Sequence, residues 1–501
     1  MNQETQVSLV SLVSQFGIVW SELLLTKKWT FYSKLACFGF FCDICSKSLI
    51  TFQKHTIMRK FLSLVFIAAL MSSCSTVKNQ QLTNYQLPAT DDVVMYQVNP
   101  RVFAPNKSLK AVEQRVKAIH DLGANVMWVM PIYPIGKVKS KNSPYSISDY
   151  KKVNPEFGTI ADMKSLVKTC HANGMSVILD WVANHTAWDN VWMKNHKDWY
   201  TQDADGNVIY PPGTDWTDVA DLNYDNPEMR AAMIDAMKFW VTEVGVDGFR
   251  CDVADQVPAD FWKDAIGQLR KAAGGRKILM LAEGANPDNF TVGGFDMNYA
   301  WGFMGTLDKV FVKGNKASDL IDCDKREYGE IPKGKIKLRF TTNHDEATKY
   351  STVQQFGSVD GALAAFVATT FLHGGMLVYG SQEVAYPEKI NFFNYVPVDW
   401  NSNPDVFATY KKLIAIYKEN PAISKGDLVT YPDDNVLAFE KTDSKDDFLI
   451  LVNVRNSKQT LKTLPTQWQN MTALDMMTGR EIRLAQSFNL EPFQYLILEK
   501  K

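Results

Sequence analysis

The sequence has few cysteines and almost no net charge, and each of these shortages argues against a class of protein. Its seven cysteines are too few and too unevenly spaced for a disulfide framework. Cys42 and Cys45 form a lone CxxC pair with no second pair, which is a weak metal signal. Cys170, Cys251 and Cys323 are predicted to be buried free thiols. The net charge of −1 gives no electrostatic reason to expect nucleic acid or an anionic membrane surface as a partner.

A short segment near the N-terminus has the features of an export signal. The basic start MRK (58–60) precedes the apolar run 61–71 and then SSC (72–74). This order is typical of secretory signals, and the run is shorter than the roughly 20 residues of a membrane-spanning helix. Residues 58–73 resemble a bacterial lipoprotein signal peptide, in which Cys74 becomes the lipidated N-terminus. The resemblance implies a lipid-anchored protein of the periplasm or outer membrane.

Residues 1–57 precede this signal, although signal peptides act from the N-terminus. We therefore predict that translation begins at Met58 and that 1–57 are a misassigned extension. The alternative is a genuine additional segment, since 31–41 is quite apolar. Intact-mass analysis of the native protein distinguishes the two. Residues 74–90, rich in Ser, Thr, Asn and Gln, are predicted to be a flexible tether.

Strand-like and helix-like segments alternate from residue 91 onward. Residues 93–98 and 126–130 have strand composition, and between them 108–122 places its apolar residues on one helical face before Gly123. The strands are too apolar for a solvated face, which favours a parallel sheet covered by helices. Further strands are expected at 248–252, 277–283, 295–301, 337–344 and 375–380. About eight strands over 91–420 predict an α/β fold, the (β/α)8 TIM barrel.

Two regions differ from this alternation. Residues 186–224 are rich in Trp, Asp, Gly and Pro and are too long for an ordinary connection, which predicts a small inserted domain. Residues 425–501 contain short strand-like runs separated by turn signals. This pattern predicts a C-terminal all-β sandwich domain.

Four short stretches place polar residues at the ends of strand-like runs: DWVANH (180–185), GFRCD (248–252), LAEG (281–284) and TNHD (342–345). The carboxyl ends of barrel strands together form the active site. Three separated acids in these stretches supply the carboxylates that cleavage of a glycosidic bond requires. The three acids are Asp252, Glu283 and Asp345.

The surroundings of each acid suggest its role. Arg250 and Asp252 are two apart on one strand, so their side chains point the same way. The guanidinium is expected to lower the pKa of Asp252 and keep it ionised, as a nucleophile requires. Glu283 follows an apolar run, which predicts a raised pKa and a role as general acid and then base. Asp345 is expected to hold sugar hydroxyls. The alternative for each acid alone is a structural salt bridge or a cap.

These four stretches, together with SPYSISDY (143–150) and NPEFGT (154–159), resemble the signature regions of glycoside hydrolase family 13, the α-amylase family, across roughly 90–500. The resemblance implies Asp252 as nucleophile, Glu283 as acid/base and Asp345 as transition-state stabiliser. It also implies that 186–224 are a short domain B. Substrate-binding roles are implied for five further residues: Tyr145, Asp180, His185, Arg250 and His344.

The sequence departs from the family at Asp255 and Gln256, where many α-amylases carry Lys-His. The acceptor-side subsites and the family's calcium site therefore stay open. Asn184 matches one family calcium ligand and Asp221 is a candidate for another, although an asparagine bonded to a loop is the alternative. No cofactor is expected for the chemistry. Tryptophans near the insertion are expected to include both packing residues and sugar platforms: Trp181, Trp188, Trp192, Trp199 and Trp216.

The leading functional hypothesis is a monomeric retaining hydrolase of α-1,4-linked glucans or maltooligosaccharides that acts through a covalent glycosyl-aspartate. An α-1,6-acting or transglycosylating enzyme with the same site is the second hypothesis. A glucan-binding protein on an inactive barrel is the third, and the presence of all three acids argues against it.

Overall fold

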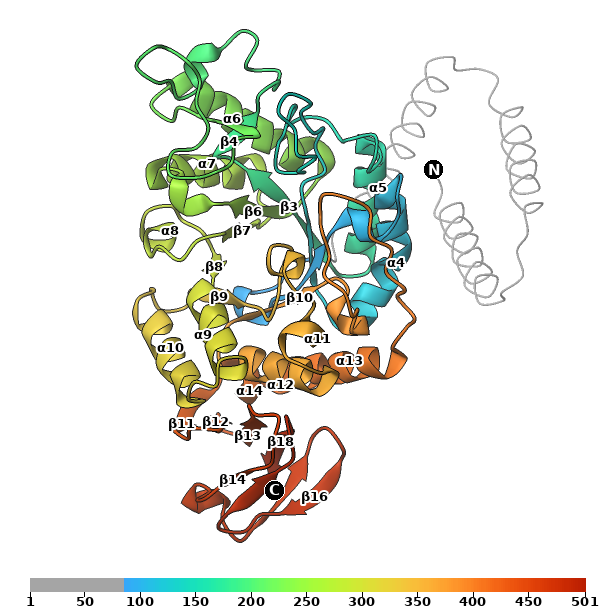
Figure 1. The fold of residues 1–501 in the computed structure, drawn as a ribbon, viewed down its shortest axis with the longest axis vertical. Coiled ribbons are helices and arrows are strands. Elements are labelled where there is room, and N and C mark those ends of the chain that lie inside the picture. Colours follow the sequence, from blue (N-terminus) through green and yellow to red (C-terminus); the bar gives the residue numbers. More distant parts are fainter. Residues whose placement is uncertain (1–84) are drawn as a thin grey trace, which may run out of the picture. The chain divides into compact units, whose positions relative to one another are not determined.

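The computed structural model describes residues 85–501. Within them, eight parallel strands close into a barrel in the order β1-β10-β9-β8-β7-β6-β3-β2, with helices around its outside (Figure 1). The chain is therefore the α/β protein with a (β/α)8 barrel that the alternating pattern predicts. The strands are β1 (Val94–Val98), β2 (Val126–Val129), β3 (Ser176–Val182), β6 (Gly248–Asp252), β7 (Leu279–Ala282), β8 (Met297–Tyr299), β9 (Ile336–Arg339) and β10 (Gly375–Tyr379).

Most of the surrounding helices follow from their apolar faces and end signals. In α4, Leu109, Val112, Val116 and Ile119 are buried, and Gly123 ends the helix with a φ of 115°. The helices of the barrel region are α4 (Ser108–Leu122), α5 (Ile160–Ala172), α6 (Pro227–Phe239), α7 (Ala259–Ala272), α8 (Asp288–Thr291), α9 (Trp301–Phe311), α10 (Ser318–Gly329), α11 (Thr352–Gln355), α12 (Val359–Thr370), α13 (Pro404–Glu419) and α14 (Pro421–Lys425).

The helix that starts at Pro227 changes form before its end. Asn226 caps α6 by accepting hydrogen bonds from the main-chain N–H groups of Glu228 and Met229. The α-helix stops at Phe239 and continues as a π-helical turn over Trp240–Val244. This wider turn places the Trp240 indole where it donates a 2.7 Å hydrogen bond to the Tyr150 carbonyl.

Two layers of apolar side chains hold the barrel together. Alternate strand residues such as Met95, Trp128 and Leu281 fill its interior, and the intervening residues pack under the helices. Gly248 allows β6 and β7 to approach closely, because a Cβ there would lie 1.8 Å from the Leu279 carbonyl oxygen. Since β6 and β7 carry Asp252 and Glu283 at their carboxyl ends, this close approach brings the two acids together.

The segment between β3 and α6 contains a small antiparallel pair, β4 (His185–Ala187) and β5 (Val219–Asp221). The pair lies in the region predicted to be domain B. Trp199 is buried there and stacks against His196, whereas Trp188 and Trp216 are partly exposed. Trp192 stacks on Tyr150 at 5.0 Å. Of the five tryptophans, Trp181 and Trp199 are buried packing residues, and Trp188, Trp192 and Trp216 are partly exposed.

The C-terminal region is all-β, as the change of pattern after 425 predicts. A six-stranded sheet has the order β11-β12-β13-β18-β15-β16, and β14 pairs with β17. Arg455 joins this domain to the barrel by donating a 2.6 Å hydrogen bond to the Val310 carbonyl at the end of α9. The strands are β11 (Asp427–Tyr431), β12 (Val436–Thr442), β13 (Asp447–Asn453), β14 (Gln459–Leu461), β15 (Thr472–Asp475), β16 (Arg480–Arg483), β17 (Phe488–Leu490) and β18 (Tyr495–Lys500).

A buried ion cluster lies on the outer side of β9. Arg339 pairs with Asp324 at 2.8 Å and with Glu327 at 2.7 Å, both on α10. His373 contacts the other oxygen of Asp324 at 2.7 Å. Because α10 packs on β9 through these contacts, the cluster joins a helix to the barrel wall.

Several sequence predictions concern residues outside 85–501. These are the extension 1–57, the signal 58–73, Cys74 and the CxxC pair. Of the predicted tether, residues 85–90 are described, and Tyr85 stacks on His171 at 4.1 Å. Cys170, Cys251 and Cys323 are buried and free, which confirms that prediction. Within 85–501 no helix is both long and apolar enough to cross a membrane.

Candidate active site

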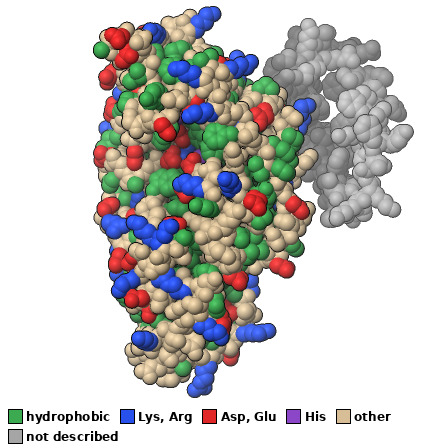
Figure 2. Space-filling view, in the orientation of Figure 1, with side chains coloured by type: hydrophobic (Ala, Val, Ile, Leu, Met, Phe, Trp, Pro, Cys, Tyr) green, Lys and Arg blue, Asp and Glu red, His purple; other side chains and the backbone are tan. Residues whose placement is uncertain are grey.

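Three carboxylates share one buried arginine at the carboxyl ends of β3, β6 and β7. The Nη1 of Arg250 lies 2.8 Å from Asp180 Oδ1 and 2.7 Å from Asp252 Oδ1. Its Nη2 lies 2.8 Å from Glu283 Oε2, a contact whose geometry is that of an ion pair and not of a hydrogen bond. Asp252 and Glu283 thus contact the same guanidinium. Asp and Glu side chains gather over β6 and β7 on the face seen in Figure 2.

Burial governs the protonation of this cluster. The Arg250 and Asp180 side chains are fully buried, and those of Asp252 and Glu283 are 10% and 12% exposed. Burial raises the pKa of Glu283 to about 8, although Arg250 opposes the rise. It likewise raises the pKa of Asp252 to about 7 and that of Asp180 to about 6.

The expected depression of the Asp252 pKa is therefore wrong. One guanidinium divided among three carboxylates does not offset the loss of hydration. Burial raises the pKa of Glu283 as well as that of Asp252, and a raised pKa suits Glu283 to hold a proton as a general acid.

A chain of hydrogen bonds joins the cluster to the ends of β1 and β9. Gln97 Nε2 donates to His344 Nδ1 at 2.8 Å, which leaves the proton of the neutral ring on Nε2. His344 Nε2 lies 2.6 Å from the Tyr145 hydroxyl, and that hydroxyl donates to Asp180 Oδ2 at 3.0 Å. Burial lowers the pKa of His344 to about 4, so this ring is neutral at pH 7.

Asp345 is the most exposed of the three predicted catalytic acids, with 41% of its side chain accessible. Its Oδ1 lies 3.4 Å from His344 Nε2, and its charge raises the pKa values of both Asp252 and Glu283. The main-chain N–H of Asp345 donates to Asn343 Oδ1 at 3.0 Å. These contacts place Asp345 at the exposed rim of the acid cluster.

His185 is the one predicted site residue that no described hydrogen bond or ion pair joins to the acids. It begins β4, is 4% exposed and meets Trp216 edge-on at 5.6 Å. Burial lowers its pKa to about 3, so the ring is neutral. The remaining predicted residues, Tyr145, Asp180, Arg250 and His344, all contact one another or an acid.

Four further residues touch the cluster and were not predicted from sequence. Trp128 Nε1 donates to Asp180 Oδ2 at 3.1 Å, and Arg250 Nε donates to the Tyr299 hydroxyl at 3.2 Å. Phe392 meets both Tyr145 and His344 edge-on, and Gln97 orients His344. A polar Gln97 inside the apolar run 93–98 is the one signal that could have been noticed.

Asn184 and Asp221 are adjacent, because the Leu222 main-chain N–H donates to the Asn184 carbonyl at 3.2 Å. Burial raises the pKa of Asp221, and no lysine, arginine or histidine of residues 85–501 pairs with it. A cation there would compensate this buried carboxylate, so the two residues fit calcium ligands. In the same range no three His, Cys, Asp or Glu side chains converge on a metal position.

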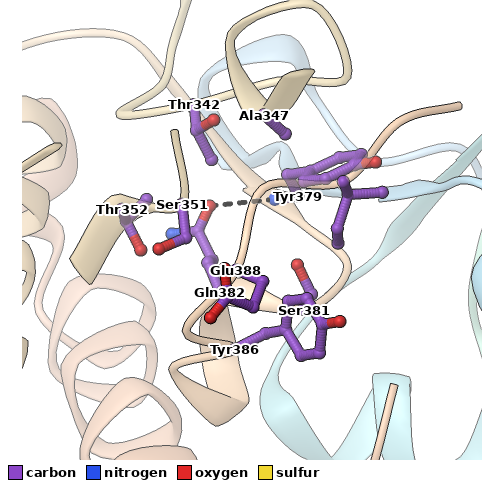
Figure 3. A pocket seen from close by; sticks show the side chains of 10 residues that line it. Thr342, Ala347, Ser351, Thr352, Tyr379, Ser381, Gln382, Tyr386 and Glu388 are labelled. Carbon is purple, nitrogen blue, oxygen red and sulfur yellow. Dashed lines mark hydrogen bonds between the residues drawn. The ribbon is translucent and has the colours of Figure 1, made fainter. Parts of the chain in front are cut away.

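A separate small pocket lies beside the end of β10 (Figure 3). Thr342, Tyr379, Gln382 and Glu388 are among its lining residues, and none of the eight predicted site residues lines it. This pocket is therefore separate from the arginine-linked acids.

The comparisons with known proteins support an α-amylase-type glycosidase. Residues 97–283 match the model of the alpha amylase catalytic domain, and residues 428–497 match that of the maltogenic amylase C-terminal domain. The barrel is thus similar to the catalytic domain of the α-amylase family over 97–283, and the C-terminal domain is similar to that of maltogenic amylases over 428–497.

Individual proteins agree with this assignment. The chain is 26% identical to alpha-amylase MalA of Haloarcula japonica over 75% of its own length, but it spans only 58% of that relative. It is 26% identical to neopullulanase 2 of Thermoactinomyces vulgaris, covering 78% of this chain and 70% of that protein. Among solved structures, a noncanonic maltogenic alpha-amylase, AmyB from Thermotoga neapolitana, superposes with a TM-score of 0.73 at 26% identity, covering 82% of this chain and 99% of the other.

Proposed function

We propose that this glycosidase hydrolyses α-1,4-glucosidic bonds in starch-type glucans or maltooligosaccharides with retention of configuration. The observation that carries the proposal is the contact of Asp252 and Glu283 with the two terminal nitrogens of one guanidinium. This contact holds the two carboxyl groups close together, as retaining glycosidases require. The raised pKa of Glu283 supplies the proton donor.

In the first step Asp252 attacks the anomeric carbon and forms a glycosyl ester. At the same time the C–O bond to the leaving sugar breaks, and Glu283 transfers its proton to the departing oxygen. In the second step the Glu283 carboxylate takes a proton from water, whose oxygen attacks the anomeric carbon and releases Asp252. Arg250 remains between both carboxylates and partly neutralises the charge that passes from one to the other.

The residues around the acids are proposed to hold the sugar. Asp345, at the rim, accepts hydrogen bonds from sugar hydroxyls as the ring flattens. His344 and Tyr145 lie with stacked rings 5.2 Å apart, and we assign them to the glucose unit that is cleaved, with Tyr145 as its platform. Asp180 supports this pair through the Tyr145 hydroxyl. Trp216, whose face is partly open beside His185, is proposed to contact the same sugar or its neighbour.

An α-1,6-acting or transglycosylating enzyme is the second candidate. Its support is the range of relatives, because the chain also resembles an oligo-1,6-glucosidase of Parageobacillus thermoglucosidasius, at 28% identity over 33% of this chain and 35% of that protein. The acids serve either linkage equally, since linkage preference depends on how the loops present the leaving sugar.

Other proposals concern the setting of the enzyme. We propose a monomer that is lipid-anchored through Cys74 in the periplasm or at the outer membrane. Calcium, if bound by Asn184 and Asp221, would hold the β4–β5 region and supply no step of the chemistry. Incorporation of labelled fatty acid into the native protein, and its loss in Cys74→Ser, tests the anchor.

Digestion of starch, pullulan and maltoheptaose tests the proposed function. The wild type is expected to shorten starch and maltoheptaose and to release products first as the α-anomer, seen by proton NMR. Asp252→Asn and Glu283→Gln are compared with Asp324→Asn, which removes a buried carboxylate from the Arg339 cluster, at a temperature where all are folded. Cleavage of α-1,6 bonds alone would favour the second candidate. Glucan binding without turnover by the wild type would contradict an active enzyme.

A further inference from the structure

The turn that follows Asp252 is bonded to the segment that follows Glu283. The Ala254 main-chain N–H donates to the Glu283 carbonyl at 2.9 Å, and the Glu283 N–H donates to the Cys251 carbonyl at 2.9 Å. The Trp262 indole N–H holds the turn by donating a 3.1 Å hydrogen bond to the Ala254 carbonyl. The two acids are therefore linked by main-chain bonds as well as through Arg250.

Asp255 extends this link to the loop beyond Glu283. Its Oδ2 accepts hydrogen bonds from the main-chain N–H groups of Ala285, at 2.9 Å, and Asn286, at 3.3 Å. Its Oδ1 accepts a 2.8 Å hydrogen bond from the side chain of Asn289, which is 4% exposed. One exposed carboxylate thus holds three donors of the 285–289 segment.

Gly284 makes this approach possible. A Cβ at position 284 would lie 2.0 Å from Asp255 Oδ1, so any larger residue would push the carboxylate away. Glycine at position 284, directly after Glu283, therefore leaves the space that the Asp255 carboxylate occupies.

The backbone of Val253 is strained, and this conformation needs support from the residues around it. It has a φ of 36° and a ψ of 48°, a left-handed conformation that is strained for a β-branched residue. In this conformation its main-chain N–H donates a 2.8 Å hydrogen bond to Glu283 Oε2. The strained turn thus supplies a direct hydrogen bond to the carboxylate, and the turn persists only if its surroundings hold it.

We propose that Asp255 is a positioning residue for Glu283. By fixing the 284–289 segment against the 253–256 turn, it keeps the Glu283 carboxyl at the Val253 N–H and in reach of the leaving-group oxygen. Its role rests on the proposed function of Glu283 as acid/base. Displacement of an acid by about 1 Å can slow a reaction about 100-fold.

The test compares two substrates that differ in their need for an acid. Asp255→Ala is expected to lower kcat on maltoheptaose by roughly 10- to 100-fold. On an aryl maltotrioside with a good leaving group, the loss is expected to be no more than about threefold, because that leaving group departs without protonation. Asp255→Asn keeps acceptor oxygen for the main-chain donors and is expected to restore most of the lost rate.

Asp288→Ala is the matched control, because it removes a carboxylate of the same segment that bonds only to the Thr291 hydroxyl. It should leave both substrates at the wild-type rate. If Asp255→Ala fails to fold, Asn289→Ala, which removes one of the three donors, takes its place with a smaller but equally selective loss. An equal loss on both substrates, with or without a lower Tm, would overturn the positioning role.

The two proposals can fail separately. If Glu283→Gln shows no selective loss on maltoheptaose, the acid role itself is wrong. If Glu283→Gln shows that selectivity and Asp255→Ala does not, only the positioning role of Asp255 is wrong.

Discussion

Two buried arginines in this protein bind carboxylates in opposite ways. Arg250 is shared by Asp180, Asp252 and Glu283, and burial raises the pKa of all three acids. Arg339 pairs with two acids, and a histidine contacts one of them. Burial opposes ionisation of Asp324 too, yet its hydrogen bond to His373 and the charge of Arg339 together lower its pKa.

The ratio of charges explains the difference. At the barrel mouth three carboxylates compete for one guanidinium, so at least one keeps a proton near neutral pH. On the outer side of β9, the Arg339 guanidinium pairs with two carboxylates and the His373 imidazole contacts one of them, and Asp324 remains ionised. An excess of buried acid is costly for stability and useful for catalysis, whereas a balanced cluster is suited to holding α10 on the barrel.

Asp252→Asn is expected to have the largest effect. Loss of the nucleophile should lower kcat on maltoheptaose by on the order of 10⁴-fold, while the fold and glucan binding persist. Steady-state kinetics together with calorimetric titration of maltoheptaose measure both quantities. Turnover within tenfold of the wild type would show that another group attacks the sugar.

Arg339→Met should lower stability and leave kcat almost unchanged, which is the opposite of the effect of Asp252→Asn. Two buried acids would lose their cation, and the free energy of unfolding should fall by about 3–5 kcal/mol. The kcat of the folded variant should stay within about twofold of the wild type, since Arg339 touches no residue of the acid cluster. Urea unfolding and kinetics at low temperature provide the two readouts. A large kcat loss in the fully folded variant would end the distinction between the two clusters.

Tyr145→Phe is expected to have a smaller effect on the catalytic cluster. It removes the hydroxyl between Asp180 and His344 but keeps the ring. A hydrogen bond to a charged group contributes about 1.5–3 kcal/mol, so kcat/KM should fall roughly 10- to 100-fold. Tyr145→Ala, which also removes the stacking face, should lose more. Equal losses in the two variants would show that the hydroxyl and not the ring matters.

A change of pH should have the most gradual effect on kcat/KM. Below about pH 7 Asp252 takes up a proton and loses its nucleophilic oxygen, and above about pH 8 Glu283 loses the proton that it must donate. The kcat/KM is therefore expected to peak between these values and to fall about tenfold per pH unit on either side. In Glu283→Gln the alkaline fall should disappear. A wild-type optimum near pH 5 would contradict the raised pKa values.

Much of the fold was predictable from local pattern. The α4 helix has the predicted bounds, because Gly123 and the buried face of Val112, Val116 and Ile119 mark it unambiguously. The strand predicted over 337–344 is shorter in the structure, where β9 ends at Arg339. Residues beyond it leave the sheet because their side chains and main chain bond within the active-site loop, as Asn343 does with Asp345.

Part of the candidate site was likewise predictable from the sequence, and part was not. The places of Asp252 and Glu283 after apolar runs were sufficient to predict that these two acids meet, whereas Asp345 contacts His344 and the third acid on Arg250 is Asp180. The direction in which the Asp252 pKa shifts was not predictable. It depends on how many carboxylates share one guanidinium and on how much water reaches them. Gln97, Trp128 and Phe392 come from segments far apart in the sequence, so only the closed barrel brings them to His344, Asp180 and Tyr145.

The order of amino acids by itself determined the alternation of strands and helices and the all-β C-terminal domain, and it placed Asp252 and Glu283 after apolar runs, because each depends on neighbours within a few residues. The tertiary structure alone decided that Asp180 competes with Asp252 and Glu283 for Arg250, and that Asp255 reaches the loop after Glu283. Both facts depend on distances between separate strands and turns. Electrostatic energy in a buried site depends on those distances and on the exclusion of water, neither of which a linear sequence contains.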